Sequence, residues 1–148
     1  MKKIWMIPLI MTMMNAAEHR TFSLKELSAV QPGMGTVMME YGHRFYVLYY
    51  AAKAENWELA AYELHEQLEI QEVGETTRPG YAKKLKAFED TYLLKLEKAV
   101  KMKKWPEFEK LYAEVTKACN QCHVETGHGY IRYQLPDTPP TMLKMELK

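Results

Sequence analysis

Cysteine is scarce in this chain, with only two among 148 residues. So few thiols exclude the disulfide-rich frameworks that small secreted domains use in place of a large core. Glycine and proline number seven each, and we find no low-complexity segment or fixed-period repeat. With 47% hydrophobic and 26% charged residues, the composition is that of a single globular domain that can bury a core.

Net charge is also small. The chain carries 20 basic and 19 acidic residues, a formal charge of +1. A balanced chain lacks the broad basic field that binding to nucleic acids or anionic membranes requires. No nucleic acid is therefore expected as a partner.

Long hydrophobic runs are limited to one, "IWMIPLIMTMM" at residues 4–14. It is shorter than the roughly 20 residues that span a bilayer. Lys2 and Lys3 precede it and Ala16 and Ala17 follow it, which is the arrangement of a secretory signal peptide. We expect residues 1–17 to direct export to the periplasm and no membrane span to remain after cleavage. The alternative is a retained apolar N-terminal helix.

Helical periodicity dominates the rest of the chain, and alternating strand patterns are scarce. Four stretches are predicted as helices: about Gly35 to Lys53, Asn56 to about Gly74, about Tyr81 to Met102, and Trp105 to about Gly127. Asn56 suits an N-cap and Gly74 a C-terminal stop. Pro106 suits the first turn of a helix, where its missing N–H is not needed.

The predicted inner faces follow three- and four-residue steps. They comprise Met34, Met38, Tyr41, Phe45, Leu48 and Ala52; Trp57, Ala61, Leu64 and Leu68; Tyr81, Leu85, Phe88, Tyr92, Leu96 and Ala99; and Phe108, Leu111, Val115 and Ala118.

Four helices with short connections predict an all-α fold, a four-helix bundle of up-down-up-down topology. An array of α-hairpin repeats is disfavoured because the sequence has no period. Residues 18–34 would form an N-terminal extension, residues 35–128 a haem-binding bundle and residues 129–148 an irregular tail. Three prolines in that tail prevent a regular helix.

The two cysteines belong to one motif, Cys119-Asn120-Gln121-Cys122-His123, which has the C-x-x-C-H pattern of c-type haem attachment. Two intervening residues let one helical turn present both thiols to a porphyrin edge, where they add to the vinyl groups as thioethers. The imidazole of His123 then projects toward the iron as its proximal ligand. The motif predicts one covalent haem c and its iron.

Other interpretations of the cysteine pair stay open. A Cys119–Cys122 disulfide gives no role to His123, and a thioredoxin-like redox pair needs a βαβ context that is missing here. A zinc site could recruit His128 as a fourth ligand, but the second ligand pair, His123 and His128, would be cramped. The pattern can also arise by chance.

At this motif the chain resembles the class II cytochromes c, the cytochrome c′ group, over roughly Met34 to His123. The resemblance implies a four-helix bundle with the haem on its last helix, and a homodimer through the first two helices. It departs from the family in continuing past His123 with "ETGHGYIRYQLPDTPP". The stretch "NWELAAYELHE" is also similar to exported proteobacterial proteins that carry a C-terminal C-x-x-C-H followed by a "GHGYI"-type segment.

The resemblance further implies that the residue opposite His123 comes from the first helix. Met38 is the predicted distal ligand because it shares a stripe with Tyr41 and Phe45, and Met34 is the second choice. Core filling is the alternative role for either methionine. His43, His65 and His128 are predicted not to bind iron. The first two are expected to be exposed or hydrogen-bonded, and the third is expected to lie in a turn.

Two arginines, Arg44 and Arg132, are candidates for paired hydrogen bonds to the haem propionates, and Tyr130 and Tyr133 could cover a haem edge. The expected function is one-electron transfer between redox proteins in the periplasm, with His123 and a methionine at the iron. The alternative is a five-coordinate haem that binds NO or CO as a scavenger or sensor. No acid–base constellation suggests an enzyme.

Overall fold

The computed structural model describes residues 21–146, so the predicted export signal at residues 1–17 lies outside the described residues. Within residues 21–146 every regular element is helical and no strand occurs, which confirms the all-α class. None of the helices in this part of the chain is long and apolar enough to cross a membrane.

The described chain divides between Gln31 and Pro32 into two compact units. The first unit contains a short helix, α1 (Leu24–Ala29), which was not predicted within the 18–34 extension. A capping box starts it: the Ser23 hydroxyl accepts the Glu26 N–H at 3.3 Å, and the Glu26 carboxylate accepts the Ser23 N–H at 2.9 Å. The Ser-x-x-Glu pattern is the sequence signal for this start.

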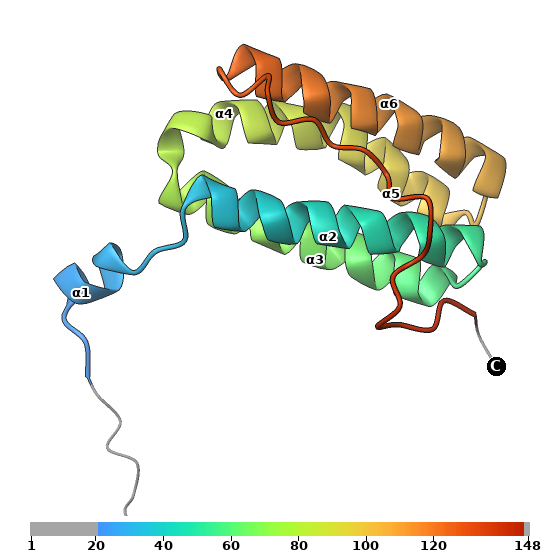
Figure 1. The fold of residues 1–148 in the computed structure, drawn as a ribbon, viewed down its shortest axis with the longest axis horizontal. Coiled ribbons are helices and arrows are strands. Elements are labelled where there is room, and N and C mark those ends of the chain that lie inside the picture. Colours follow the sequence, from blue (N-terminus) through green and yellow to red (C-terminus); the bar gives the residue numbers. More distant parts are fainter. Residues whose placement is uncertain (1–20, 147–148) are drawn as a thin grey trace, which may run out of the picture. The chain divides into compact units, whose positions relative to one another are not determined.

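The second unit contains the remaining helices. These are α2 (Met34–Lys53), α3 (Trp57–Thr77), α4 (Pro79–Phe88), the π-helical turn η1 (Glu89–Leu93), α5 (Leu94–Lys101) and α6 (Trp105–Glu125). Figure 1 shows α2 beside α3, and α4 to α5 beside α6. The segment after α6, residues 129–146, runs back along the helices. We call it the strap. Because α4, η1 and α5 follow without a break, they match the third predicted stretch.

Two of the three predicted helix-end signals are confirmed, and one is wrong. Asn56 caps α3 by accepting the Leu59 N–H at 3.1 Å, and Pro106 lies in the first turn of α6. Gly74 does not end α3, which continues to Thr77 and stops before Pro79. A Cβ at Gly74 would lie 3.0 Å from Val37 Cγ1, so the glycine instead lets α2 and α3 approach closely.

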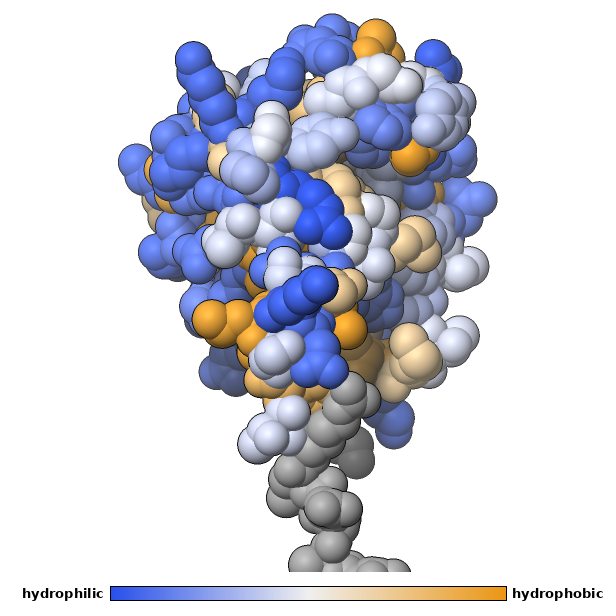
Figure 2. All heavy atoms as spheres, turned by 90° about the vertical axis from the view of Figure 1, so that its left-hand side faces the viewer, coloured by the Kyte–Doolittle hydropathy of each residue, from blue (hydrophilic) through white to orange (hydrophobic). Residues whose placement is uncertain are grey.

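The core joins α2, α3, α5 and α6 through aliphatic and aromatic side chains. Phe45 of α2 stacks on Tyr112 of α6 with ring centroids 3.9 Å apart, and Tyr133 of the strap adds a third ring 5.3 Å from Phe45. Most predicted inner-face residues are buried or half-buried, but Ala61 is exposed. The surface seen in Figure 2 is mostly hydrophilic, with smaller hydrophobic patches between the polar side chains.

Candidate functional site

Both cysteines and His123 lie in the last turns of α6. Residues three apart on a helix are neighbours on one face, so Cys119 and Cys122 present their sulfurs to the same side. The two thiols are free rather than joined as a disulfide. Cys119 packs against the core cluster, whereas Cys122 lies nearer the α4 side, where Lys84 pairs with Glu125 of α6 at 3.4 Å.

Burial keeps both thiols neutral. It raises the pKa of Cys119 to about 12, with a further contribution from the neighbouring Cys122. The pKa of Cys122 is raised too, mainly by burial, but Lys84 opposes that rise. A buried neutral thiol is a poor nucleophile, so these cysteines do not have the low thiol pKa of a disulfide oxidoreductase.

We expect the haem-free polypeptide to show this difference in alkylation by iodoacetamide. At pH 8.5 Cys122 should react faster than Cys119, because burial raises the pKa of Cys119 to about 12 while Lys84 opposes the rise at Cys122, and only the thiolate is alkylated. Peptide mass spectrometry at timed quenches measures both rates, and a urea-unfolded sample in which they converge is the control. Faster labelling of Cys119 in the folded chain would contradict its buried environment.

The imidazole of His123 is held in one orientation. Its Nδ1 lies 3.0 Å from the Ile131 carbonyl oxygen. A carbonyl can only accept, so this contact requires Nδ1 to carry a proton, and in the neutral imidazole Nε2 then keeps a free lone pair. A hydrogen bond from the second ring nitrogen to a carbonyl is the usual way in which proteins orient a metal-binding histidine.

The turn after α6 brings Ile131 to this place. Gly127 adopts a left-handed φ of 79°, which glycine alone reaches without strain. The Gly127 N–H donates to the Val124 carbonyl at 3.1 Å and the His128 N–H to the His123 carbonyl at 2.7 Å. This pair of bonds is a Schellman motif. It reverses the chain so that the strap returns past His123.

Asn120, inside the C-x-x-C sequence, fastens the strap to α6. Its side chain accepts the Tyr133 N–H at 2.8 Å and donates to the Tyr133 carbonyl at 3.0 Å. The Tyr133 and Tyr112 hydroxyls are also hydrogen-bonded, at 2.8 Å. Further along, Tyr50 and Tyr46 of α2 donate to the carbonyls of Pro136 and Thr138 at 2.7 and 2.6 Å. Residues 129–146 of the predicted irregular tail therefore form a strap across α2 and α6.

The inner face of α3 is unexpectedly polar next to these cysteines. Glu63, Gln67 and Gln71 are buried there. This stripe was not predicted, because helical periodicity of the apolar residues placed Trp57 and Ala61 inward. The hydroxyl of Tyr41, both polar atoms of Gln67 and the Gln71 carbonyl oxygen have no hydrogen-bond partner. Burial raises the pKa of Tyr41 well above its ordinary value, and both cysteines lie close enough to add to that rise.

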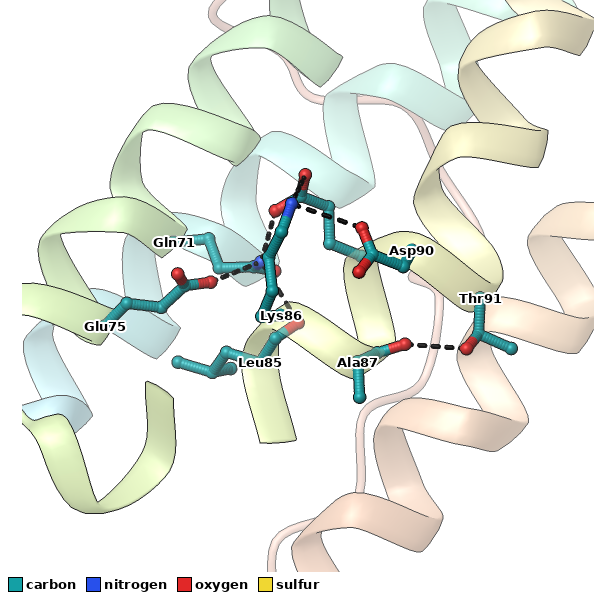
Figure 3. A network of polar contacts seen from close by, with 8 residues as sticks. Gln71, Glu75, Leu85, Lys86, Ala87, Asp90 and Thr91 are labelled. Carbon is teal, nitrogen blue, oxygen red and sulfur yellow. Dashed lines mark hydrogen bonds and ion pairs between the residues drawn. The ribbon is translucent and has the colours of Figure 1, made fainter. Parts of the chain in front are cut away.

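Gln71 connects this polar stripe to the π-helical turn. Its amide nitrogen donates to Glu75 at 3.0 Å and to the Leu85 carbonyl and Glu89, both at 3.3 Å. Figure 3 shows Gln71, Glu75 and Leu85 together, with Lys86 reaching toward Asp90. Thr91 donates to the Ala87 carbonyl at 2.6 Å, as Figure 3 also shows. Single π-turns inside helices occur often at functional sites, and η1 packs on α6.

The predicted methionine ligand is only half-buried. On α2 it is Val37 that is fully buried, whereas Met38 is partly exposed and Met39 is exposed. Met34 packs near Gly74, since its Cε lies 3.6 Å from a Cβ built there. Tyr41, on the same helix, lies close enough to both thiols for them to raise its pKa.

The two candidate arginines occupy different places. Arg44 pairs with Glu40 at 2.7 Å, with the buried Glu63 at 3.2 Å and with Glu66 at 3.8 Å. Burial alone would lower its pKa, but the Glu40 and Glu63 carboxylates outweigh burial and raise it. Arg132 lies in the strap and lines an open hollow beside α6, together with Lys117 and Val124.

The remaining histidines have ordinary surroundings. His65 contacts Glu69 at 3.2 Å and both are exposed. His43 lies edge-on to Tyr46, and the His128 ring contacts the Thr126 hydroxyl at 3.3 Å. Among residues 21–146, no group of three or more His, Cys, Asp and Glu side chains is arranged to hold a metal ion, so the zinc ligand set is not brought together there.

At the motif, two cysteines lie on one face of α6 and His123 Nδ1 contacts the Ile131 carbonyl. The residue types and their order are those of c-type haem attachment. The buried Tyr41 of α2 lies close enough to both thiols for them to affect its pKa. Comparison with models of protein families, with curated proteins and with solved structures gave no match to this chain.

Proposed function

We propose that this chain is an exported monohaem c-type cytochrome that transfers single electrons in the periplasm. Cys119 and Cys122 would hold haem c through thioether bonds, and His123 Nε2 would bind its iron. The observation that carries the proposal is the hydrogen bond from His123 Nδ1 to the Ile131 carbonyl, because it leaves Nε2 free for iron. The haem supplies the one-electron redox chemistry.

The proposed fold is the cytochrome c′-like four-helix bundle with up-down-up-down topology. Its support is the succession of α2, α3, the continuous α4–η1–α5 and α6, joined by short turns. In such a bundle the core would keep water from a bound haem, and the Ile131 carbonyl would make the His123 imidazole a stronger ligand. Redox proteins are the proposed partners, and the homodimer rests on the family resemblance alone.

A second candidate function is the binding of NO or CO at a five-coordinate iron. It is favoured by the partial exposure of Met38 and by the burial of Val37 and Tyr41 on the same helix. In the electron-transfer proposal Met38 is the distal ligand, with Arg44 and Arg132 near the propionates. In the gas-binding proposal His123 would be the only protein ligand of the iron.

The test is export of the full chain in a host that matures c-type cytochromes. We expect the purified protein to be coloured and to have the mass of the processed chain plus one haem. The variant with both Cys119→Ser and Cys122→Ser should be colourless and lack this added mass. A colourless wild-type protein of bare polypeptide mass would refute the haem proposal.

The absorption spectrum of the loaded protein separates the two functions. A charge-transfer band of Met–Fe ligation, abolished by Met38→Ala, indicates the electron carrier. A high-spin spectrum that shifts with CO and is unaffected by Met38→Ala indicates the gas binder.

A further inference from the structure

Two polar contacts join α6 to the strap beside the cysteine motif. Asn120 pairs with the backbone of Tyr133, accepting its N–H at 2.8 Å and donating to its carbonyl at 3.0 Å. The Nδ1 atom of His123 lies 3.0 Å from the Ile131 carbonyl oxygen. Asn120 and His123 are three residues apart on one helix and are therefore neighbours on its surface. Their partners are two residues apart in the strap and follow in the opposite order, so both contacts belong to one antiparallel register.

The Ile131 carbonyl is held between two backbone attachments. Before it, the Ile131 N–H donates to the His128 carbonyl at 2.8 Å, in the turn that follows α6. After it, only Arg132 intervenes before Tyr133, the residue that Asn120 binds. The side chains of Ile131 and Arg132 are exposed, so their packing does little to place this carbonyl. Its position therefore depends on the turn and on Asn120.

A second attachment at Tyr133 differs in kind from the first. Its hydroxyl is hydrogen-bonded to the Tyr112 hydroxyl at 2.8 Å, and its ring centroid lies 5.3 Å from that of Phe45. These contacts hold the side chain, which can adopt several torsion angles relative to the backbone. The paired bonds from Asn120 act on the backbone N–H and carbonyl themselves, so they fix the direction of the adjoining peptide groups.

We propose that Asn120 is a positioning residue for His123. Its two bonds to Tyr133 keep the Ile131 carbonyl aimed at Nδ1, and they thereby select the ring tautomer in which Nε2 has a free lone pair. The functional meaning rests on the proposed haem attachment, in which iron binds at Nε2. A carbonyl on the second ring nitrogen fixes the ring and raises the basicity of the ligand. A residue between the two cysteines thus tunes His123 through the strap, without touching the iron.

The first measurement uses the full chain in its haem-free form, labelled with nitrogen-15 at histidine. At about pH 8.5, where imidazole is ordinarily neutral, the chemical shifts of the two ring nitrogens show which one carries the proton. The His123→Gly chain identifies the signals of this ring. We expect the proton on Nδ1 in the wild type and mainly on Nε2 in Asn120→Ala, because Nε2 is the preferred site when Nδ1 has no acceptor.

Two variants are the matched controls. Gln121 also lies between the cysteines, but its side chain donates to Glu125 within α6 at 3.1 Å, so Gln121→Ala should leave the proton on Nδ1. Tyr133→Phe removes the hydroxyl contact with Tyr112 and keeps both backbone bonds to Asn120. It should loosen the strap and still leave Nδ1 protonated.

The second measurement is the midpoint potential of the exported, haem-loaded chain, after protein mass has established equal loading of every variant. Losing an outer hydrogen bond typically weakens metal binding by about 10- to 100-fold. A more basic imidazole favours ferric iron, so Asn120→Ala should raise the potential. The rise is about 59 mV for each tenfold loss of preference for ferric over ferrous iron. Gln121→Ala and Tyr133→Phe should keep the wild-type potential.

Three results overturn the inference. They are a wild-type His123 that carries its proton mainly on Nε2, an Asn120→Ala chain with unchanged tautomer and potential, and a Tyr133→Phe chain that changes both as much as Asn120→Ala does. If Asn120→Ala does not fold, Asn120→Asp replaces it in the haem-free measurement. It keeps the acceptor and loses the donor, and an unchanged tautomer there counts equally against the inference. A chain without added haem mass refutes the haem attachment alone, since the tautomer is measured without haem.

Discussion

Replacing His123 with glycine is expected to remove the proximal ligand of the iron in every molecule that carries haem. The proposed thioether bonds depend on Cys119 and Cys122, so the cofactor should remain attached while its spectrum changes completely. The cavity left by the imidazole retains the Ile131 carbonyl, which held Nδ1 at 3.0 Å. Imidazole added to the solution should therefore bind there, donate to that carbonyl and restore the wild-type spectrum.

His128→Gly is the control for this change. His128 lies five residues further on, and its ring contacts the Thr126 hydroxyl rather than the strap carbonyl. Its loss should leave the spectrum of the loaded protein as in wild type. A spectrum that survives His123→Gly but is altered by His128→Gly would exchange the roles of the two histidines.

Replacing Phe45 with alanine is expected to cause the largest loss of stability among the changes considered. The side chain is 1% exposed, stacks on Tyr112 and contacts the Tyr133 ring. Truncating such a phenylalanine lowers the free energy of unfolding by about 3–5 kcal/mol, through lost burial and the cavity left behind. That is a large share of the roughly 5–15 kcal/mol that stabilises a typical domain.

Denaturant unfolding of wild type and Phe45→Ala, compared in the same haem-loaded or haem-free state, measures this loss. Met39→Ala on the same helix is the control, because Met39 is 78% exposed and surface truncations usually change stability by less than about 0.5 kcal/mol. The loss should be accompanied by easier proteolysis of the strap, since the Tyr133 ring contacts the Phe45 ring. Equal stabilities of the two variants would mean that Phe45 does not anchor the strap to the core.

Local chemistry made much of the fold predictable. Asn56 and Pro106 mark the starts of α3 and α6 as predicted, because caps and first-turn prolines act through neighbouring backbone groups. The C-x-x-C-H motif and the helix that carries it are visible in the sequence for the same reason. The Schellman turn at Gly127 is equally local, since it needs only a residue that tolerates positive φ.

Residues that depend on packing between helices were predicted less well. The sequence predicts Gly74 as a helix stop. In the structure the glycine instead lets Val37 of α2 approach closely, because a Cβ at Gly74 would lie only 3.0 Å from Val37 Cγ1. Helical periodicity also predicted that Met38, and not Val37, faces inward. Both residues are apolar and they lie about 100° apart around the helix, so periodicity alone could not decide between them. Which of two adjacent apolar residues faces inward is decided by the neighbouring helix.

The amino-acid sequence by itself determined that this protein is helical and that Cys119, Cys122 and His123 share the end of one helix. It did so because these properties depend on residues within a few positions of each other. Only the tertiary structure decided that the Ile131 carbonyl orients His123 and that Tyr41 is buried near Cys119. These contacts arise where α2, α3, α6 and the strap meet, and no local sequence pattern specifies which side chains meet across that distance.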